Sequence, residues 1–362
     1  MNRRALLIGG GSAVVLASAG AGAIVSGNGS MADYEAAAAR LRAHLSEHPE
    51  LERLIVYATL AANSHNTQAW RFRLHSRSID ILPDLTRRTP AVDPDDHHLF
   101  VSLGCAAENL AIAAAATGRP GELAIAGEAS IRFNFVPGSA IPTPLLDSIA
   151  RRQSTRAVYE RRPIPAAHLS RLAEAGDVSG VRLILLTERA RIDPVRDLVI
   201  AGNTAQMGDP AFMRELKHWL RFNPRSAMAK GDGLFSAASG NPVLPTWLGG
   251  PALDLFFTTE AENDKYARQI ASSTGLAIFV GDRADKAHWI QVGRACQRFA
   301  LTATSLGLKH AFINQPVEVP RLRTELAKLL GEPDKRPDIM MRFGYGPALP
   351  FSLRRPTSAV IV

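Results

Sequence analysis

The sequence predicts an α+β protein built from two related halves that pack together as a pseudo-dimer within one chain. Three observations support this fold class. Helical and strand-type apolar patterns are interleaved along the chain. Residues 101–118 align without gaps on residues 290–307. Between these repeats, Pro137 to Pro144 reads as a linker. We therefore expect a leader over 1–27, a first half over 31–140 and a second half over 145–362.

The internal repeat pairs two Ala-rich helices, each ending in glycine. Gly104 aligns with Gly293 and Gly118 with Gly307, and three alanines coincide as well. Chance similarity of two Ala-rich helices is the competing explanation. A strand-like stretch after each copy favours true repetition, and the small residues would let the two helices approach closely.

In the first half, the spacing of apolar residues and the positions of helix- and strand-ending residues predict the helices and strands. Residues 34–45 and 49–61 have helical spacing, with Ser46 and Pro49 between them. Residues 70–74 and 78–82 alternate around a short turn, which predicts a hairpin. A long helix begins at Asp95 and Asp96, where acids suit the helix dipole, and ends before Gly118. Short strands follow near 123–126 and 131–136.

The second half is predicted in the same way. We expect helices over 145–152, 165–175, 286–306 and 319–330, and strands over 181–186, 274–280 and 338–344. Residues 192–222 are mostly helical, with a break near 208–210. Residues 223–254 are rich in Gly, Pro, Ser and Asn, and we expect an irregular but ordered lid. Residues 347–362 form an extended tail.

The 362-residue composition is that of a globular chain, with a moderate net charge of +8. Basic residues are scattered and often lie next to acids, so nothing argues for a nucleic-acid partner. The two cysteines, Cys105 and Cys296, lie in Ala-rich helices and are expected to be buried free thiols.

The N-terminal segment to about Gly27 reads as a targeting leader. Arg3 and Arg4 resemble a twin-arginine motif and precede a Gly/Ala-rich apolar stretch with small-residue sites. An uncleaved membrane anchor is the alternative. We expect export by the twin-arginine machinery, to the periplasm or to the outer face of the cytoplasmic membrane, with membrane contact only through this segment.

A polar loop between the second helix and the hairpin holds the main candidate site. Its residues Asn63 to Gln68 pack three amides, two hydroxyls and an imidazole, a set able to contact a flat heteroaromatic ligand. Far downstream, Arg152, Ser154 and Arg156 alternate, so two guanidiniums and a hydroxyl can converge on a phosphate. A solvated helix C-terminus is the alternative explanation for Arg151 and Arg152.

Together these motifs resemble those of the FMN-dependent nitroreductase family. Ser64, Gln68, Trp70 and Phe72 match its S-x-x-N-x-Q-P-W-x-F motif, Asn66 matches with the spacing shortened by one, and Ala69 replaces the proline. The 152–156 stretch matches its R-x-S-x-R/K phosphate motif. Because each motif occurs in only one half, the chain resembles the diverged, fused, Acg-like branch.

The resemblance implies two nitroreductase-like halves, a monomer in which these halves form an internal pseudo-dimer, and one non-covalent FMN between the halves. The mirror site lacks both motifs and is expected to be empty. The residues implied for FMN binding are Asn63, Ser64, Asn66, Gln68, Arg152, Ser154, Arg156, Asn314, Gln315, Arg354 and Arg355. Most family members offer a carboxylate or backbone group where Asn314 and Gln315 stand.

The implied activity is an oxidoreductase that passes electrons from NADH or NADPH to a nitroaromatic or quinone-like acceptor. An FMN store with little turnover is the alternative, favoured by the lid, by Asn314 and Gln315, and by export. No catalytic acid or base is assigned. Asp93 to His98 could suggest a metal site, but capping and salt bridging are preferred, because adjacent helical side chains diverge by about a hundred degrees. Trp70 and Phe72 are expected in the core.

Overall fold

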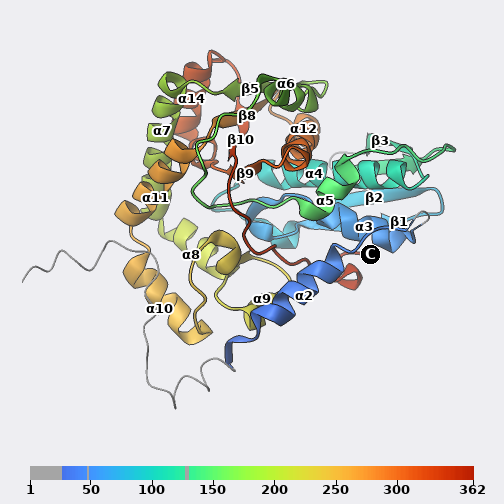
Figure 1. The fold of residues 1–362 in the computed structure, drawn as a ribbon, viewed down its shortest axis with the longest axis horizontal. Helices are drawn as coiled ribbons and strands as arrows, with labels where there is room; N and C mark the ends of the chain where they lie inside the picture. The colour runs from blue at the N-terminus through green and yellow to red at the C-terminus, as the bar shows by residue number, and fades with distance from the viewer. Residues whose placement is uncertain (1–26, 47–48, 127–129) are drawn as a thin grey trace, which may run out of the picture.

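A computed structural model describes residues 27–46, 49–126 and 130–362, and the predicted leader lies outside this range except for its last residue. The fold is α+β, as predicted. Two four-stranded antiparallel sheets lie in different parts of the chain, and helices α4 (His97–Ala116) and α12 (Lys286–Ser305) run between them (Figure 1).

The first sheet has the strand order β1-β2-β4-β3. Its strands alternate, so that one face packs on the core and Phe72 opposes Ile81 across the hairpin. Trp70 and Phe72 are fully buried, which confirms their predicted place in the core. The strands of this sheet are β1 (Trp70–Leu74), β2 (Ser78–Pro83), β3 (Gly121–Ala126) and β4 (Ser130–Phe135).

The second sheet has the order β5-β8-β10-β9, again antiparallel throughout. Its two central strands are buried along their whole length, which explains why their sequences are continuously apolar rather than alternating. The strands of this sheet are β5 (Val181–Leu186), β8 (Gly275–Gly281), β9 (Lys309–Phe312) and β10 (Pro337–Gly344).

The remaining helices cover the sheets and frame the space between them (Figure 1). Helix α13 is only one turn long, and Ile313 and Asn314 connect it to the end of β9. These helices are α2 (Met31–Leu41), α3 (Leu51–Thr59), α5 (Leu145–Arg151), α6 (Ala166–Ala175), α7 (Arg189–Met207), α8 (Pro210–Trp219), α9 (Pro224–Lys230), α10 (Thr246–Phe256), α11 (Thr259–Ser272), α13 (Gln315–Glu318) and α14 (Pro320–Leu330).

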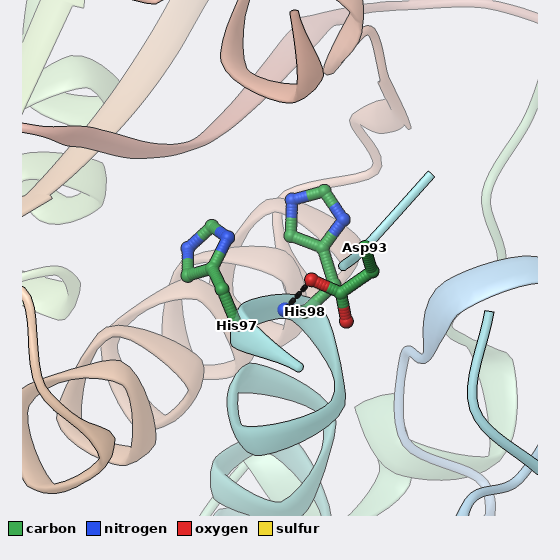
Figure 2. Close-up of side chains that lie close together, drawn as sticks. All are labelled: Asp93, His97 and His98. Carbon is green, nitrogen blue, oxygen red and sulfur yellow. Dashed lines mark hydrogen bonds between the residues drawn. The ribbon is translucent and has the colours of Figure 1, made fainter. Parts of the chain in front are cut away.

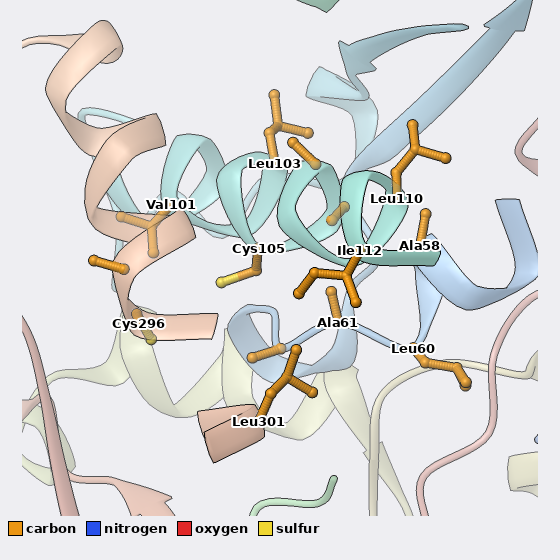
Figure 3. Packing of buried hydrophobic residues seen from close by; sticks show 14 of the residues in the cluster. Ala58, Leu60, Ala61, Val101, Leu103, Cys105, Leu110, Ile112, Cys296 and Leu301 are labelled. Carbon is orange, nitrogen blue, oxygen red and sulfur yellow. The ribbon is translucent and has the colours of Figure 1, made fainter. Parts of the chain in front are cut away.

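Helices α4 and α12 cross at the centre of the molecule through their glycines. A Cβ on Gly104 would lie 2.0 Å from the carbonyl oxygen of Ile290, and one on Gly293 would lie 2.0 Å from that of Val101. Only glycine allows two backbones to come this close. Around the crossing, Cys105, Cys296 and Leu301 pack into one continuous apolar cluster (Figure 3). Both cysteines are buried and free, as predicted.

Helix α4 is long and apolar enough to cross a membrane, with a mean hydropathy of 1.7. Most of it, however, is buried inside the protein. Helix α4 has no polar face because it is packed on several sides, by α3, α12 and the first sheet.

The C-terminal tail crosses back to the first sheet. Phe72 donates its backbone N–H to the carbonyl of Val360 at 2.7 Å, and Val362 donates to the carbonyl of Phe72 at 2.9 Å. These bonds form a parallel bridge at the outer edge of β1. The last residues of the chain thus complete a sheet built by its first third.

The expectation of an irregular segment over 223–254 is wrong. Asn223 caps α9 through a reciprocal pair of bonds with Ser226, and α10 begins immediately after Pro245. Local caps and proline at the first helical turn outweigh the Gly- and Ser-rich composition. Helix α11, which no sequence pattern led us to expect, follows with Thr258 as its N-cap.

Candidate functional site

A cavity of about 220 Å³ lies where the polar loop after α3, the start of α4 and the β9–α13 junction meet. Helices α7, α8, α10 and α11 close its other sides. Five of the predicted site residues line it: Asn63, Ser64, Arg156, Asn314 and Gln315. The motifs from the two parts of the chain therefore converge on one space.

The polar loop is held in an unusual backbone conformation. His65, Asn66 and Gln68 have φ values of 46°, 53° and 55°, a region that non-glycine residues seldom adopt. Asn63 stabilises the loop by accepting the backbone N–H of Gln68 at 2.9 Å, and Ser64 donates its N–H to Ser102 Oγ at 3.3 Å. Strain of this kind concentrates at functional sites.

At the cavity wall, His65 carries no charge at neutral pH. Burial, and then the Arg156 guanidinium, lower the pKa of its imidazole to about 4. The ring therefore offers a neutral donor or acceptor to whatever occupies the cavity. Sequence reasoning counted this imidazole in the loop but did not assign it to the site.

The predicted ring contacts of Asn66 and Gln68 need correction. Asn66 Nδ2 donates to the carbonyls of Gly233 and Leu353, at 3.1 and 3.2 Å. Gln68 Nε2 donates to the carbonyl of Gly231 at 2.8 Å, and its Oε1 accepts the N–H of Arg355. Neither residue lines the cavity. Their side-chain amides instead hydrogen-bond the loop to the segments around Gly231 and Leu353.

The 152–156 motif divides between two environments. Arg156 lines the cavity, and its Nη1 donates to Ser239 Oγ at 3.4 Å. No carboxylate forms an ion pair with Arg156 among the described residues. Arg152 is buried and donates from Nη2 to the carbonyl of Leu60 at 2.8 Å, while its Nε has no partner. Ser154 forms a bridge with His310 in β9 and does not line the cavity.

Arg152 belongs to a group of three arginines, with Arg42 and Arg354, and its charge lowers the pKa of both neighbours. Burial first, and then the Arg152 guanidinium, lower the pKa of Arg42 to about 10. Burial lowers the pKa of Arg354 well below its usual range, with further contributions from Arg42 and Arg152. None of the three pairs with a carboxylate in the described part of the chain. We call this group the arginine cluster.

Backbone carbonyls accept most of the hydrogen bonds of the cluster, and Asn66 Oδ1 accepts one more from Arg354 Nη1 at 3.0 Å. Arg354 donates to the carbonyls of Thr59, Leu60 and Ala61, where α3 ends. Cations suit a helix C-terminus, so the cluster also caps α3. Arg355 is engaged differently, with Asp84 Oδ2 at 3.9 Å and the Ala359 carbonyl at 2.7 Å.

On the opposite wall, Asn314 and Gln315 stand at the start of α13. Asn314 Oδ1 accepts the backbone N–H of Met340 at 2.8 Å, which fixes its amide against β10. One turn on, Glu318 also lines the cavity and accepts a hydrogen bond from Gln206 Nε2 at 2.5 Å. Burial raises the pKa of Glu318 to about 7. Neither sequence spacing nor composition singled out Glu318.

The acidic and histidine residues at the start of α4 lie beside the cavity. Asp93 accepts the backbone N–H groups of His98 and Leu99, each at 3.0 Å, and so caps the helix. The predicted divergence of His97 and His98 is wrong: their ring centroids lie 4.6 Å apart (Figure 2). His97 is the first helical residue and follows Asp96 in a left-handed conformation, so no preceding turn restricts its ring.

The predicted lid, 223–254, contributes to the cavity wall, but not through the residues first expected. Leu253 in α10 lines the cavity, as does Phe257, which lies three residues beyond the predicted lid. Trp247, expected with Leu248 to cover a ligand, is 72% exposed and points elsewhere. Helical geometry explains the change, because α10 presents one face to the cavity and Trp247 lies on another.

Taken together, the cavity offers amides, hydroxyls and one guanidinium without an ion pair from one side. The other side is apolar along α8 and α10 and polar along α7 and α11. Such a space suits a flat, polar-edged ligand, and the arginine cluster suits an attached anion.

Comparison with known proteins gives a consistent result. The sequence model of the Nitroreductase family matches residues 149–345. Rv3131, a Mycobacterium tuberculosis protein named as an NAD(P)H nitroreductase, is 24% identical over 340 residues, covering 89% of this chain and 94% of that protein.

The similarity to solved structures is weaker. A Bacteroides fragilis nitroreductase with bound FMN has 18% identity and a TM-score of 0.35, covering 57% of this chain and 90% of that one. The Mycobacterium smegmatis FMN-dependent nitroreductase NfnB, in complex with NADPH, has 11% identity and a TM-score of 0.37, covering 56% and 87%.

Proposed function

The chain belongs to the nitroreductase family, and on this premise we propose that it is an FMN-dependent oxidoreductase. The observation that carries the proposal is the arginine cluster beside a polar cavity. Three guanidiniums without a carboxylate are costly to bury together, and a phosphate dianion would offset that cost.

The residues present fit FMN as two groups, one for its phosphate and one for its ring. Arg42, Arg152 and Arg354 would hold the phosphate. Asn63, Ser64, Arg156, Asn314 and Gln315 would contact the polar edge of the ring. When bound, FMN supplies hydride and electron transfer. Asn66, Gln68 and Arg355 act by holding the loop in place, and Ser154 contributes through its backbone.

The side chains of this site bind and orient rather than exchange protons. His65 is neutral, and the Asn and Ser side chains do not titrate near neutral pH. Leu253 and Phe257 restrict the entry of water from the α10 side. We assign no catalytic acid or base.

For the electron donor we propose NADH or NADPH, and for the acceptor a nitroaromatic or quinone-like compound. The name of the mycobacterial relative supports the donor. The test is an absorption spectrum of the purified protein followed by anaerobic mixing with each coenzyme. We expect a flavin band that bleaches and then recovers when a nitroaromatic is added. A protein that purifies without flavin and does not take up added FMN would rule the proposal out.

A flavin store is the second candidate, and the position of α10 favours it. The cavity, with Leu253 and Phe257 in its wall, has a volume of about 220 Å³, below the usual range for small-molecule sites of about 300–1,000 Å³. Deleting all of 223–254 would remove the carbonyls of Gly231 and Gly233 that hold the polar loop. The sharper test is Leu253→Ala with Phe257→Ala. If only this variant is reduced by NADH or NADPH, the flavin is stored rather than turned over.

We also propose that the two halves, 31–140 and 145–362, form an internal pseudo-dimer of the fused, Acg-like kind. The strand orders support this. In each half, the chain forms two neighbouring strands, then a long helix, α4 or α12, and then a strand at the far edge of the sheet. The last strand, β4 or β10, lies between that edge strand and the second strand. The close approaches at α4 and α12 are reciprocal and fall on aligned repeat positions.

For localisation we propose twin-arginine export to the periplasm, or anchoring on the outer face of the cytoplasmic membrane. Arg3, Arg4 and the apolar stretch after them support this. Arg3→Lys with Arg4→Lys should leave the folded protein in the cytoplasm, as measured by fractionation. Unchanged export would instead indicate the general secretory route or a simple anchor.

A further inference from the structure

The start of α4 gathers metal-ligating side chains outside the proposed flavin contacts. Asp93, His97 and His98 are each at most 4% exposed, and each offers one ligand atom within 4.8 Å of the other two. Figure 2 shows the two imidazoles side by side, with the Asp93 carboxylate next to His98. Two nitrogen donors and an oxygen donor thus share one small, buried volume.

Two further carboxylates face these histidines from the second half of the chain. Asp338 Oδ1, on β10, lies 3.1 Å from His97 Nε2, and Glu318 Oε1, on α13, lies 3.6 Å from His98 Nδ1. Histidines that bind metals commonly have a carboxylate on the other ring nitrogen, which fixes the ring and raises its basicity. Both histidines therefore have the supporting group that such a site needs.

One buried nitrogen here lacks a partner. His97 Nε2 and Asp338 Oδ1 face each other at 3.1 Å, and Asp338 Oδ1 also lies 3.9 Å from Arg336 Nε, whereas His98 Nε2 has no hydrogen bond within the described chain. Buried polar groups are nearly always satisfied, so this nitrogen, beside the Asp93 carboxylate, indicates a missing partner. A cation is the partner that imidazole nitrogens and carboxylate oxygens have in common.

The charge of the surroundings agrees with a divalent cation. Four carboxylates lie in or beside the cluster, those of Asp93, Asp95, Glu318 and Asp338. Two guanidiniums oppose them. Arg336 pairs with Asp95 at 2.6 Å, and Arg323 donates to the carbonyl of Val317 at 2.6 Å. With the carboxylates ionised, two negative charges remain to be balanced.

We propose that Asp93, His97 and His98 bind one divalent transition-metal ion of the Zn²⁺ class, with Asp338 and Glu318 supporting the two histidines. Mixed imidazole and carboxylate donors suit Zn²⁺, and a site without sulfur does not select Cu⁺. The ion would tie the start of α4 to β10 and α13 and stiffen one wall of the cavity. It does not depend on flavin.

The experiment uses full-length protein without a histidine tag, treated with chelator, dialysed, and titrated with zinc sulfate by calorimetry. Bound zinc is then counted by mass spectrometry. We expect about one Zn²⁺ per chain. His97→Asn should weaken binding at least 100-fold, and Asp338→Asn about 10- to 100-fold. A wild-type protein that retains no stoichiometric zinc overturns the proposal, whether or not the variants fold.

The matched control is His310→Asn. His310 is also buried with two unpartnered ring nitrogens, but lies in β9 outside the cluster. It should bind zinc like the wild type. Equal weakening by His97→Asn and His310→Asn would show that any disturbed buried histidine lowers the affinity, and would overturn the assignment.

Discussion

At the scale of single residues, the arginines carry the functional argument. Arg152 could be placed in a phosphate site from the sequence, because its motif is local. Arg42 could not, since it stands near the end of a helix over a hundred residues away and only the tertiary fold brings it to Arg152. No sequence pattern indicates that two arginines far apart in the chain lie close together in the fold.

The arginines give the first prediction. Arg152→Ala with Arg156→Ala should strip the flavin, because it removes one guanidinium from the phosphate group and the unpaired one from the cavity. The measurement is flavin absorbance per chain after purification. Arg151→Ala is the control, since Arg151 is exposed and bonds only to its own helix. A double variant that stays fully yellow contradicts the assignment.

A second prediction concerns acid stability. The Arg132 guanidinium, and to a lesser degree His75, lower the pKa of Asp80 to about 2 from an ordinary 3.8. A lowered folded-state pKa stabilises the fold above the unfolded pKa and stops doing so as the pH falls through the folded one. Asp80→Asn should therefore lower the Tm at pH 7, and the difference should shrink between about pH 4 and pH 2.

The comparison for that prediction is Asp197→Asn. Asp197 also pairs with an arginine, Arg196 at 2.8 Å, but its side chain is 64% exposed. Exposed pairs contribute little, so its Tm should stay close to that of the wild type at every pH. Equal changes in Tm for the two substitutions would show that the Asp80 pair stabilises the fold no more than an exposed pair does.

At the scale of elements, periodicity predicted most of what has a regular pattern. Alternation predicts the hairpin 70–74 and 78–82 to within a residue, and the β-branched and leucine residues of 181–186 predict that strand. Helices α9 and α10 were missed because their caps lie among glycines and prolines. The left-handed residues of the polar loop were missed because nothing local requires them; the contacts to Gly231, Gly233 and Leu353 hold them there.

The helix crossing gives the third prediction. Gly104→Ala or Gly293→Ala would drive a Cβ into a backbone carbonyl, which cannot swing aside, so unfolding should become easier by about 3 kcal/mol or more. Gly250→Ala in α10 is the control, because no atom lies within 4 Å of its Cβ position. Denaturant unfolding measures both. Tolerance of both central substitutions would mean that the helices are not so closely packed.

At the scale of the whole molecule, the two proposed halves are unequal. Both sheets have the same strand order, yet the polar loop occurs only before the first sheet and the arginine motif only before the second. On the pseudo-dimer that we propose, these motifs would complete a single site, and the mirror position would keep the architecture without the ligand contacts. This asymmetry would distinguish the chain from a symmetric dimer.

The last prediction follows from that asymmetry. The purified protein should carry one FMN per chain and behave as a monomer, as measured by flavin absorbance together with light scattering after gel filtration. Apoprotein titrated with FMN should saturate at the same ratio. Two flavins per chain would require a working mirror site and would contradict the assignment of the motifs.

The bridge between Phe72 and Ile361 has a consequence for how the protein is made. Phe72 leaves the ribosome long before Val360 and Val362 do, and until then the outer edge of β1 has unpaired backbone groups that another chain can capture. The edge of the first sheet is thus covered only after residues 360–362 have been made. A chain cut between Phe72 and Val360 would expose an open strand, whereas a chain that contains these residues covers that edge with its own tail.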